Sequence, residues 1–143
     1  MAARMKLEGT YMFSFSGFDR ASDHACYVAG VGTLVLAGNA MKGEQRVTNS
    51  PMSGQSTNLD NTTYAITGTY TVDDAGPPIV ATATVLFTEK APGTKKLSDQ
   101  FAVVQSGPDR LRMISMRPHD EVRNIDVQEL ISGEMIKVDD ATW

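Results

Sequence analysis

Apolar and polar residues alternate with a period of two through most of the chain, and a helical period of about 3.6 residues is found almost nowhere. The clearest segment is Thr62–Val72, in which Tyr64, Ile66, Tyr70 and Val72 share one face. A polar loop precedes this segment and an Asp-Asp-Ala-Gly turn follows it, so both ends of the strand are defined. We predict that the aromatic face is buried and the threonine face exposed. The threonines predicted to be exposed are Thr67, Thr69 and Thr71.

Several further segments alternate in the same way, and residues typical of turns separate them. Gly38-Asn39 suits a tight hairpin, and Gly, Pro, Asp and Ser gather between the other segments. The predicted strands are Leu7–Gly17, Cys26–Ala37, Met41–Asn49, Thr62–Val72, Ile79–Thr88, Gln100–Gln105, Arg110–Met116 and Asp126–Val138.

About eight strands joined in order by short turns predict an all-β protein, built as a single antiparallel up-and-down β-barrel. A closed barrel removes the strand edges that an open sheet leaves exposed. Glycines inside the strands, among them Gly30, Gly32 and Gly68, favour closure further, because strands of a barrel must coil sharply at some points. A two-sheet β-sandwich would use the same strands and is the alternative. In both cases residues 1–143 form one domain.

Two segments carry more specific expectations. Cys26–Ala37 is apolar on both faces, which predicts a central strand covered on two sides. Residues 119–130 fit one or two helical turns, whereas residues 126–138 fit a last strand with Gly133 at a bulge. We favour the strand, because an even number of antiparallel strands lets the sheet close.

The charge balance narrows the choice of partners. The 143 residues contain 13 Lys and Arg against 17 Asp and Glu, which gives a net charge of −4. This balance argues against nucleic acid and anionic membranes, since both attract clustered positive charge. No segment approaches the roughly 18 continuous apolar residues of a membrane span, and no signal peptide is visible. We expect a cytoplasmic protein, or an exported one if the sequence is a trimmed form, and a monomer with a homodimer as the alternative.

The order of glycine and aromatic residues resembles that of a known group of domains. It runs Leu7-Glu8-Gly9-Thr10-Tyr11-Met12-Phe13-Ser14-Phe15-Ser16-Gly17-Phe18-Asp19, then Ala29-Gly30-Val31-Gly32-Thr33, Ala37-Gly38-Asn39 and Ile66-Thr67-Gly68-Thr69-Tyr70. This order is similar to that of uncharacterised bacterial barrel-like domains, up to about Met116. The resemblance implies lipocalin-like or allene oxide cyclase-like architecture, in which barrels bind or cyclise apolar molecules. Gly9-Thr10-Tyr11 stands where lipocalins have Gly-x-Trp, and the resemblance assigns no catalytic residue.

The candidate binding residues are mainly aromatic side chains on faces expected to point inward. An eight-stranded barrel is about wide enough inside to be filled by side chains or to hold one small ligand. Aromatic residues with hydroxyl groups can line such a pocket and orient a polar group of the ligand. These aromatic candidates are Tyr11, Phe13, Phe15, Tyr64, Tyr70 and Phe87.

Arg112 is a further candidate, because it alternates with apolar residues in Arg110–Met116. If its face lines the barrel, the guanidinium group would hold a carboxylate ligand. The alternative is that Arg112 points to solvent while Leu111 and Met113 face the interior.

Other chemistry is sparse. His24 and His119 stand beside aspartates in polar surroundings that indicate surface loops, and Cys26 has no assignable base. No phosphate-binding loop, nucleophile elbow or zinc pattern occurs. We therefore expect no metal and no cofactor, and no catalytic residue is assigned.

The sequence supports two main hypotheses about function. In the first, the barrel binds a mostly apolar small molecule in its interior. In the second, the protein is a non-enzymatic structural or interaction module with a filled core. A small cyclase or isomerase is a further alternative. The volume inside the barrel separates the first hypothesis from the second.

Overall fold

The computed structural model describes residues 7–21, 24–51, 60–74, 76, 78–90, 96–122, 124–126 and 128–141. Within them, the backbone alone is described at residues 19–21, 24–26, 49–51, 60–61, 125–126 and 128–129. The described part of the chain contains strands and turns and no helix. The strands are β1 (Gly9–Ala21), β2 (His24–Ala37), β3 (Ala40–Pro51), β4 (Asp60–Asp74), β5 (Val80–Glu89), β6 (Lys96–Gly107), β7 (Arg110–Ser115), β8 (His119–Asp120), β9 (Ile125–Asp126) and β10 (Gln128–Asp139).

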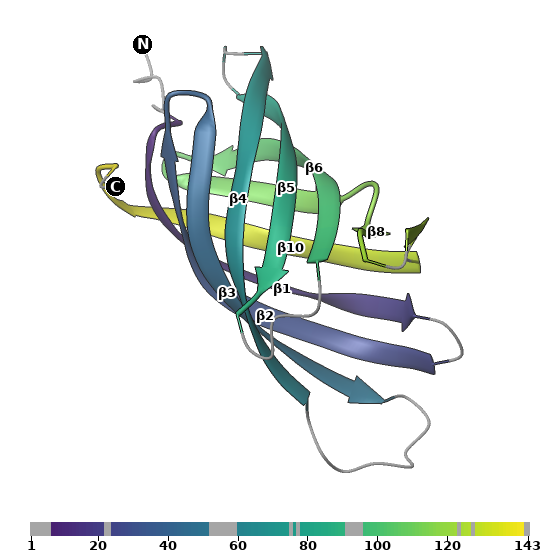
Figure 1. Ribbon diagram of the computed structural model, residues 1–143. Helices are drawn as coiled ribbons and strands as arrows, with labels where there is room; N and C mark the ends of the chain where they lie inside the picture. Colours follow the sequence, from purple (N-terminus) through teal and green to yellow (C-terminus); the bar gives the residue numbers. More distant parts are fainter. Residues whose placement is uncertain are drawn as a thin grey trace.

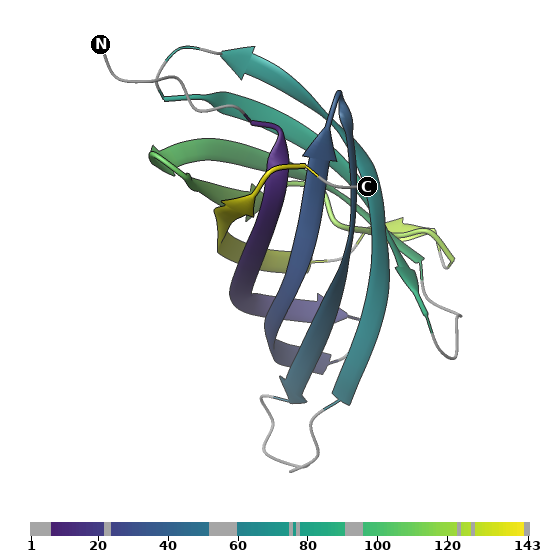
Figure 2. The same cartoon turned by 90° about the vertical axis from the view of Figure 1, so that its left-hand side faces the viewer.

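The strands close into an antiparallel barrel (Figures 1 and 2). Each strand from β1 to β6 pairs with the next, and β10 pairs with both β7 and β1. Eight strands therefore form the barrel, while the short β8 and β9 extend the sheet beside β6. The predicted up-and-down barrel is confirmed, and the sandwich alternative is not the fold.

The alternation in β4 produces the predicted inner and outer faces. Tyr64, Ile66 and Tyr70 are buried, whereas Thr67, Thr69 and Thr71 are exposed. Val72 departs from the pattern and is exposed, and the pairing of β4 with β5 shifts register directly after it, between Val72 and Asp74.

Aromatic rings cover glycines of the neighbouring strand. Phe13 and Phe15 of β1 lie opposite Gly32 and Gly30 of β2. A Cβ atom at Gly30 would lie 2.2 Å from the Phe15 ring, and one at Gly32 would lie 2.5 Å from the Phe13 ring. The two rings stack with their centroids 6.2 Å apart and their planes at 14°. The glycines thus leave space that the rings occupy, and β1 can bend sharply around the interior (Figure 2).

Two of the specific expectations are wrong. The β2 strand is covered on one side only, since Tyr27 and Val31 are more than half exposed on the outer face of the barrel. Gly133 does not form a bulge, because it pairs in regular register with both Phe15 and Met113. A Cβ atom at Gly133 would lie 2.3 Å from the carbonyl oxygen of Ser14, so the close approach of β1 and β10 explains this glycine.

The segment before β10 forms a small irregular hairpin in its described part. The β7 strand ends at Ser115, and the chain then supplies β8, which pairs with the first residues of β6. A turn containing Asn124, with a φ of 54°, leads into β9. The alternative of helical turns in this region is therefore wrong for the described residues, and the preferred last strand, β10, is confirmed.

Candidate functional site

One end of the barrel is closed by chain segments and tyrosine hydroxyl groups, and we call it the closed end. Here residues 7–8, the turn at Gly38 and Asp140, just after β10, come together. Tyr11 Oη donates a hydrogen bond to the Leu7 carbonyl oxygen at 2.7 Å, and Tyr70 Oη donates one to the Gly38 carbonyl oxygen. Thr10 Oγ1 donates to the Asp140 carbonyl oxygen at 2.7 Å. These contacts attach both ends of the described chain to one rim.

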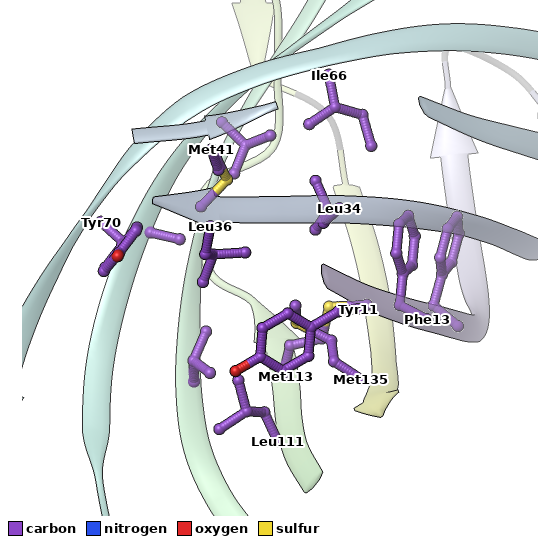
Figure 3. Packing of buried hydrophobic residues seen from close by; sticks show 14 of the residues in the cluster. Tyr11, Phe13, Leu34, Leu36, Met41, Ile66, Tyr70, Leu111, Met113 and Met135 are labelled. Atoms are coloured by element: carbon purple, nitrogen blue, oxygen red, sulfur yellow. The ribbon is translucent and has the colours of Figure 1, made fainter. Parts of the chain in front are cut away.

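Both tyrosine hydroxyl groups at the closed end are hydrogen-bonded within the protein. Burial raises the pKa of Tyr11 and of Tyr70 above the usual range of a phenol. The neutral hydroxyl groups therefore remain donors to backbone carbonyl groups. Tyr11 and the neighbouring Leu111 have no exposed surface, and the labelled side chains in Figure 3 show them packed together.

A cavity of about 120 Å³ lies inside the barrel. Side chains from the barrel strands line it, and most of them are apolar. Members of this apolar lining are Leu34, Met41, Ile66, Val85, Ile131 and Met135.

The structure brings most of the predicted aromatic candidates together. Phe13, Phe15, Tyr64, Tyr70 and Phe87 all line the cavity. Tyr11 also points inward, but it lies in the packed core and is not part of the cavity lining. The alternation of apolar and polar residues therefore predicted correctly that these aromatic side chains face the barrel interior.

The inward placement of Arg112 is wrong, and the alternative is observed. Its side chain is 61% exposed, and its Nη1 atom lies 4.0 Å from Glu134 Oε2. Arg110 Nη1 lies 2.8 Å from the other carboxylate oxygen of Glu134. The register of β7 places these charges on the outer face, while Leu111 and Met113 face the interior.

Asp99 is a buried carboxyl group in the cavity wall, only 5% exposed. Its Oδ1 atom accepts hydrogen bonds from the backbone N–H groups of Gln100, at 2.7 Å, and Arg117, at 2.9 Å. Its Oδ2 atom accepts one from Ser115 Oγ. Burial raises the pKa of Asp99, although these hydrogen bonds act in the opposite direction. Asp99 thus holds the chain where it leaves β7.

The end of the cavity opposite the closed end is bordered by β5, β6 and β8, and we call it the cavity mouth. The lining residues here are only half-buried, namely Phe87, Leu97, Pro118 and His119. His119 Nε2 lies 3.1 Å from Asn124 Oδ1. The prediction of a surface loop for His119 is wrong, because β8 sets it beside the cavity. A strand of two residues has no periodicity that would have indicated this.

Gln45 is a cavity-lining residue that the sequence reasoning missed. It lies on β3, where it pairs with Gly32 of β2 and Tyr64 of β4. Its side chain is buried, with 8% exposed, and lines the cavity. In the described part of the chain, no hydrogen bond to its side-chain amide is found. Its place on the inward face, between Gly43 and Val47, is the signal that would have identified it.

Other candidates contribute less to the site. The side chains of His24 and Cys26 lie outside the described residues. Among the residues that are described, no group of three or more His, Cys, Asp or Glu side chains is placed to hold a metal ion. The described segments also include no helix long and apolar enough to cross a membrane.

The fold and the cavity together define a small antiparallel barrel with a mainly apolar interior. No family model matches the chain, and no curated protein matches it. Among solved structures, EF1p2_mFAP2b bound to DFHBI is similar, with a TM-score of 0.50 and 12% identity over 92% of this chain and 94% of that chain. The S-type phycobiliprotein lyase CPES from Guillardia theta has a TM-score of 0.37 and 8% identity, over 92% and 88% of the two chains. The likeness to EF1p2_mFAP2b shows the fold alone, and it agrees with the small barrel that the motif resemblance implied.

Proposed function

We propose that this protein binds a mostly apolar small molecule inside the barrel. The observation that carries the proposal is the cavity of about 120 Å³ with its mainly apolar lining. An apolar protein cavity of roughly 150 Å³ binds benzene, so this space is on the scale of one aromatic ring. Apolar walls with a few polar groups are typical of small-molecule sites. The fold likeness supports the proposal, because EF1p2_mFAP2b is bound to DFHBI in its structure.

The charges of the described lining favour an uncharged ligand. No Lys or Arg belongs to the lining, and Arg112 is on the outside of the barrel. A carboxylate would therefore lose its hydration without gaining a cationic partner, which is costly. A cationic ligand would have to compete for Asp99, whose oxygen atoms already accept hydrogen bonds from the protein.

Isothermal titration calorimetry with toluene, a probe whose single aromatic ring matches the size of the cavity, tests this function. We expect saturable binding that ends near one toluene molecule per chain. Ala83→Met should weaken binding, because Ala83 is a buried lining residue and a longer side chain fills the cavity. Thr84→Met is the matched control, since Thr84 is exposed on the same strand. Arg112→Ala should also leave the affinity unchanged.

Two results would contradict the proposal. The first is the absence of saturable binding of toluene to the wild-type protein, which would favour a filled structural module. The second is equal affinity of the Ala83→Met and Thr84→Met variants, which would place the bound probe outside the cavity. Circular dichroism of each variant establishes that the barrel is intact.

A further inference from the structure

The buried polar groups of the barrel interior differ in how they are satisfied. The hydroxyl groups of Tyr11 and Tyr70 donate to backbone carbonyl groups, and the Asp99 carboxyl group accepts several hydrogen bonds. Gln45 has the same degree of burial, yet its amide makes no hydrogen bond within the described part of the chain. Buried polar groups are nearly always paired in native proteins, because an unpaired donor or acceptor loses its water without compensation.

Gln45 is buried on the inward face of β3, and its side chain belongs to the cavity lining. Its pairing partner on β2 is Gly32, which has no side chain, and the Phe13 ring covers that glycine. Its pairing partner on β4 is Tyr64, another lining residue. A carboxamide in this position offers one acceptor, Oε1, and donors on Nε2. Among the described lining residues, Gln45 is the one whose uncharged side chain carries a donor and an acceptor side by side. It can therefore form a planar pair of hydrogen bonds with a ligand.

We infer that Gln45 determines the specificity of the cavity, and that the ligand is an uncharged, flat molecule with an N–H group beside a carbonyl group. Lactams, cyclic imides and primary amides on an aromatic ring belong to this chemical class. The ligand N–H donates to Gln45 Oε1, and Gln45 Nε2 donates to the ligand carbonyl oxygen. This inference rests on the proposed function, since it names the ligand class for the same cavity.

Binding of two pyridone isomers tests the inference. In 2-pyridone the N–H and the carbonyl group are adjacent, whereas in 4-pyridone they lie on opposite sides of a ring of the same size. By isothermal titration calorimetry, we expect the wild-type protein to bind 2-pyridone about tenfold more tightly than 4-pyridone, as the loss of one well-made hydrogen bond requires. Toluene provides the apolar reference.

The variant Gln45→Met keeps the length of the side chain and removes both hydrogen-bonding groups. We expect the affinity for 2-pyridone to fall about tenfold, while toluene binds equally or more tightly. Arg46→Met, on the exposed face of the same strand, should change neither affinity.

The outcomes separate this inference from the proposed function. If toluene does not bind the wild-type protein, the proposed function itself fails. If toluene binds but the two pyridones bind equally, or if Gln45→Met retains the affinity for 2-pyridone, the role of Gln45 is overturned. Should Gln45→Met fail to fold, the comparison of the two isomers on the wild-type protein still decides the matter.

Discussion

The two ends of the barrel use the same alternating strands to different effect. At the closed end, Tyr11 and Leu111 have no exposed surface, and the tyrosine hydroxyl groups are bonded to backbone carbonyl groups. At the cavity mouth, Leu97, Pro118 and His119 are only half-buried and border a space. Inward-facing strand residues are therefore fully buried at the closed end, as Leu111 is, and only half-buried at the cavity mouth, as Leu97 is.

The two ends of the barrel differ in the chain segments that border them. Short chain segments and hydroxyl groups seal the closed end, whereas β7 stops at Ser115 and the two-residue β8 takes its place beside β6. The wall at the cavity mouth is thus built from shorter pieces. Aromatic content alone does not distinguish the ends, because Tyr11 fills the core while Tyr64 lines the cavity.

Truncation of a leucine at each end should show the largest contrast. Leu111→Ala should lower the free energy of unfolding by about 2–5 kcal/mol, because it removes a fully buried side chain. Leu97→Ala at the cavity mouth should cost clearly less, since Leu97 is only partly buried. Urea denaturation of both variants measures the two losses, and equal losses would mean that the ends are packed alike.

Asp99 offers a test of the wall beside the cavity mouth. Asp99→Ala should lower the free energy of unfolding by about 1–3 kcal/mol, because Ser115 Oγ and the Arg117 N–H group lose their acceptor. Asp99→Asn should retain most of these contacts, since an amide oxygen still accepts from the backbone and an amide N–H can donate to Ser115 Oγ. Asp99→Asn is therefore the matched control for the loss of hydrogen bonds.

Comparison of Asp99→Asn with the wild-type protein also predicts how stability depends on pH, with a defined sign. Because burial raises the pKa of Asp99, its protonated form is favoured in the folded state. Its stabilising contribution is fully present below the ordinary value of 3.8 and is lost as the pH rises through the raised pKa. The free energy of unfolding of Asp99→Asn relative to wild type should therefore rise over this interval. A difference that stays constant with pH would show that the carboxyl group is not desolvated.

Among these variants, Tyr11→Phe should lower the free energy of unfolding the least, and it should leave ligand binding unchanged. The change removes the hydrogen bond to the Leu7 carbonyl oxygen, and the free energy of unfolding should fall by about 0.5–1.5 kcal/mol. Because Tyr11 lies outside the cavity lining, the affinity for toluene should stay at the wild-type value. A large loss of affinity in this variant would show that the closed end takes part in the site.

Much of the fold was predictable from local patterns, because alternation and turn residues act within a few positions. The predicted strand Thr62–Val72 corresponds to β4, Asp60–Asp74, with the expected faces. Phe13, Phe15 and Phe87 were expected inside for the same reason and line the cavity. The position of Arg112 was not decided by alternation, since its neighbours on both faces of the strand are apolar.

The sequence by itself determined the class, the order of the strands and the inner face of most of them, because each follows from side-chain alternation along a strand. Only the tertiary structure decided which inner residues meet, where β8 lies and whether space remains between the side chains. His119 became part of the site because β8 pairs with β6, whereas Gln45 lies on an inward face that the alternation along β3 already indicates. A cavity is the volume left by side chains of many strands at once, and no short stretch of sequence records that sum.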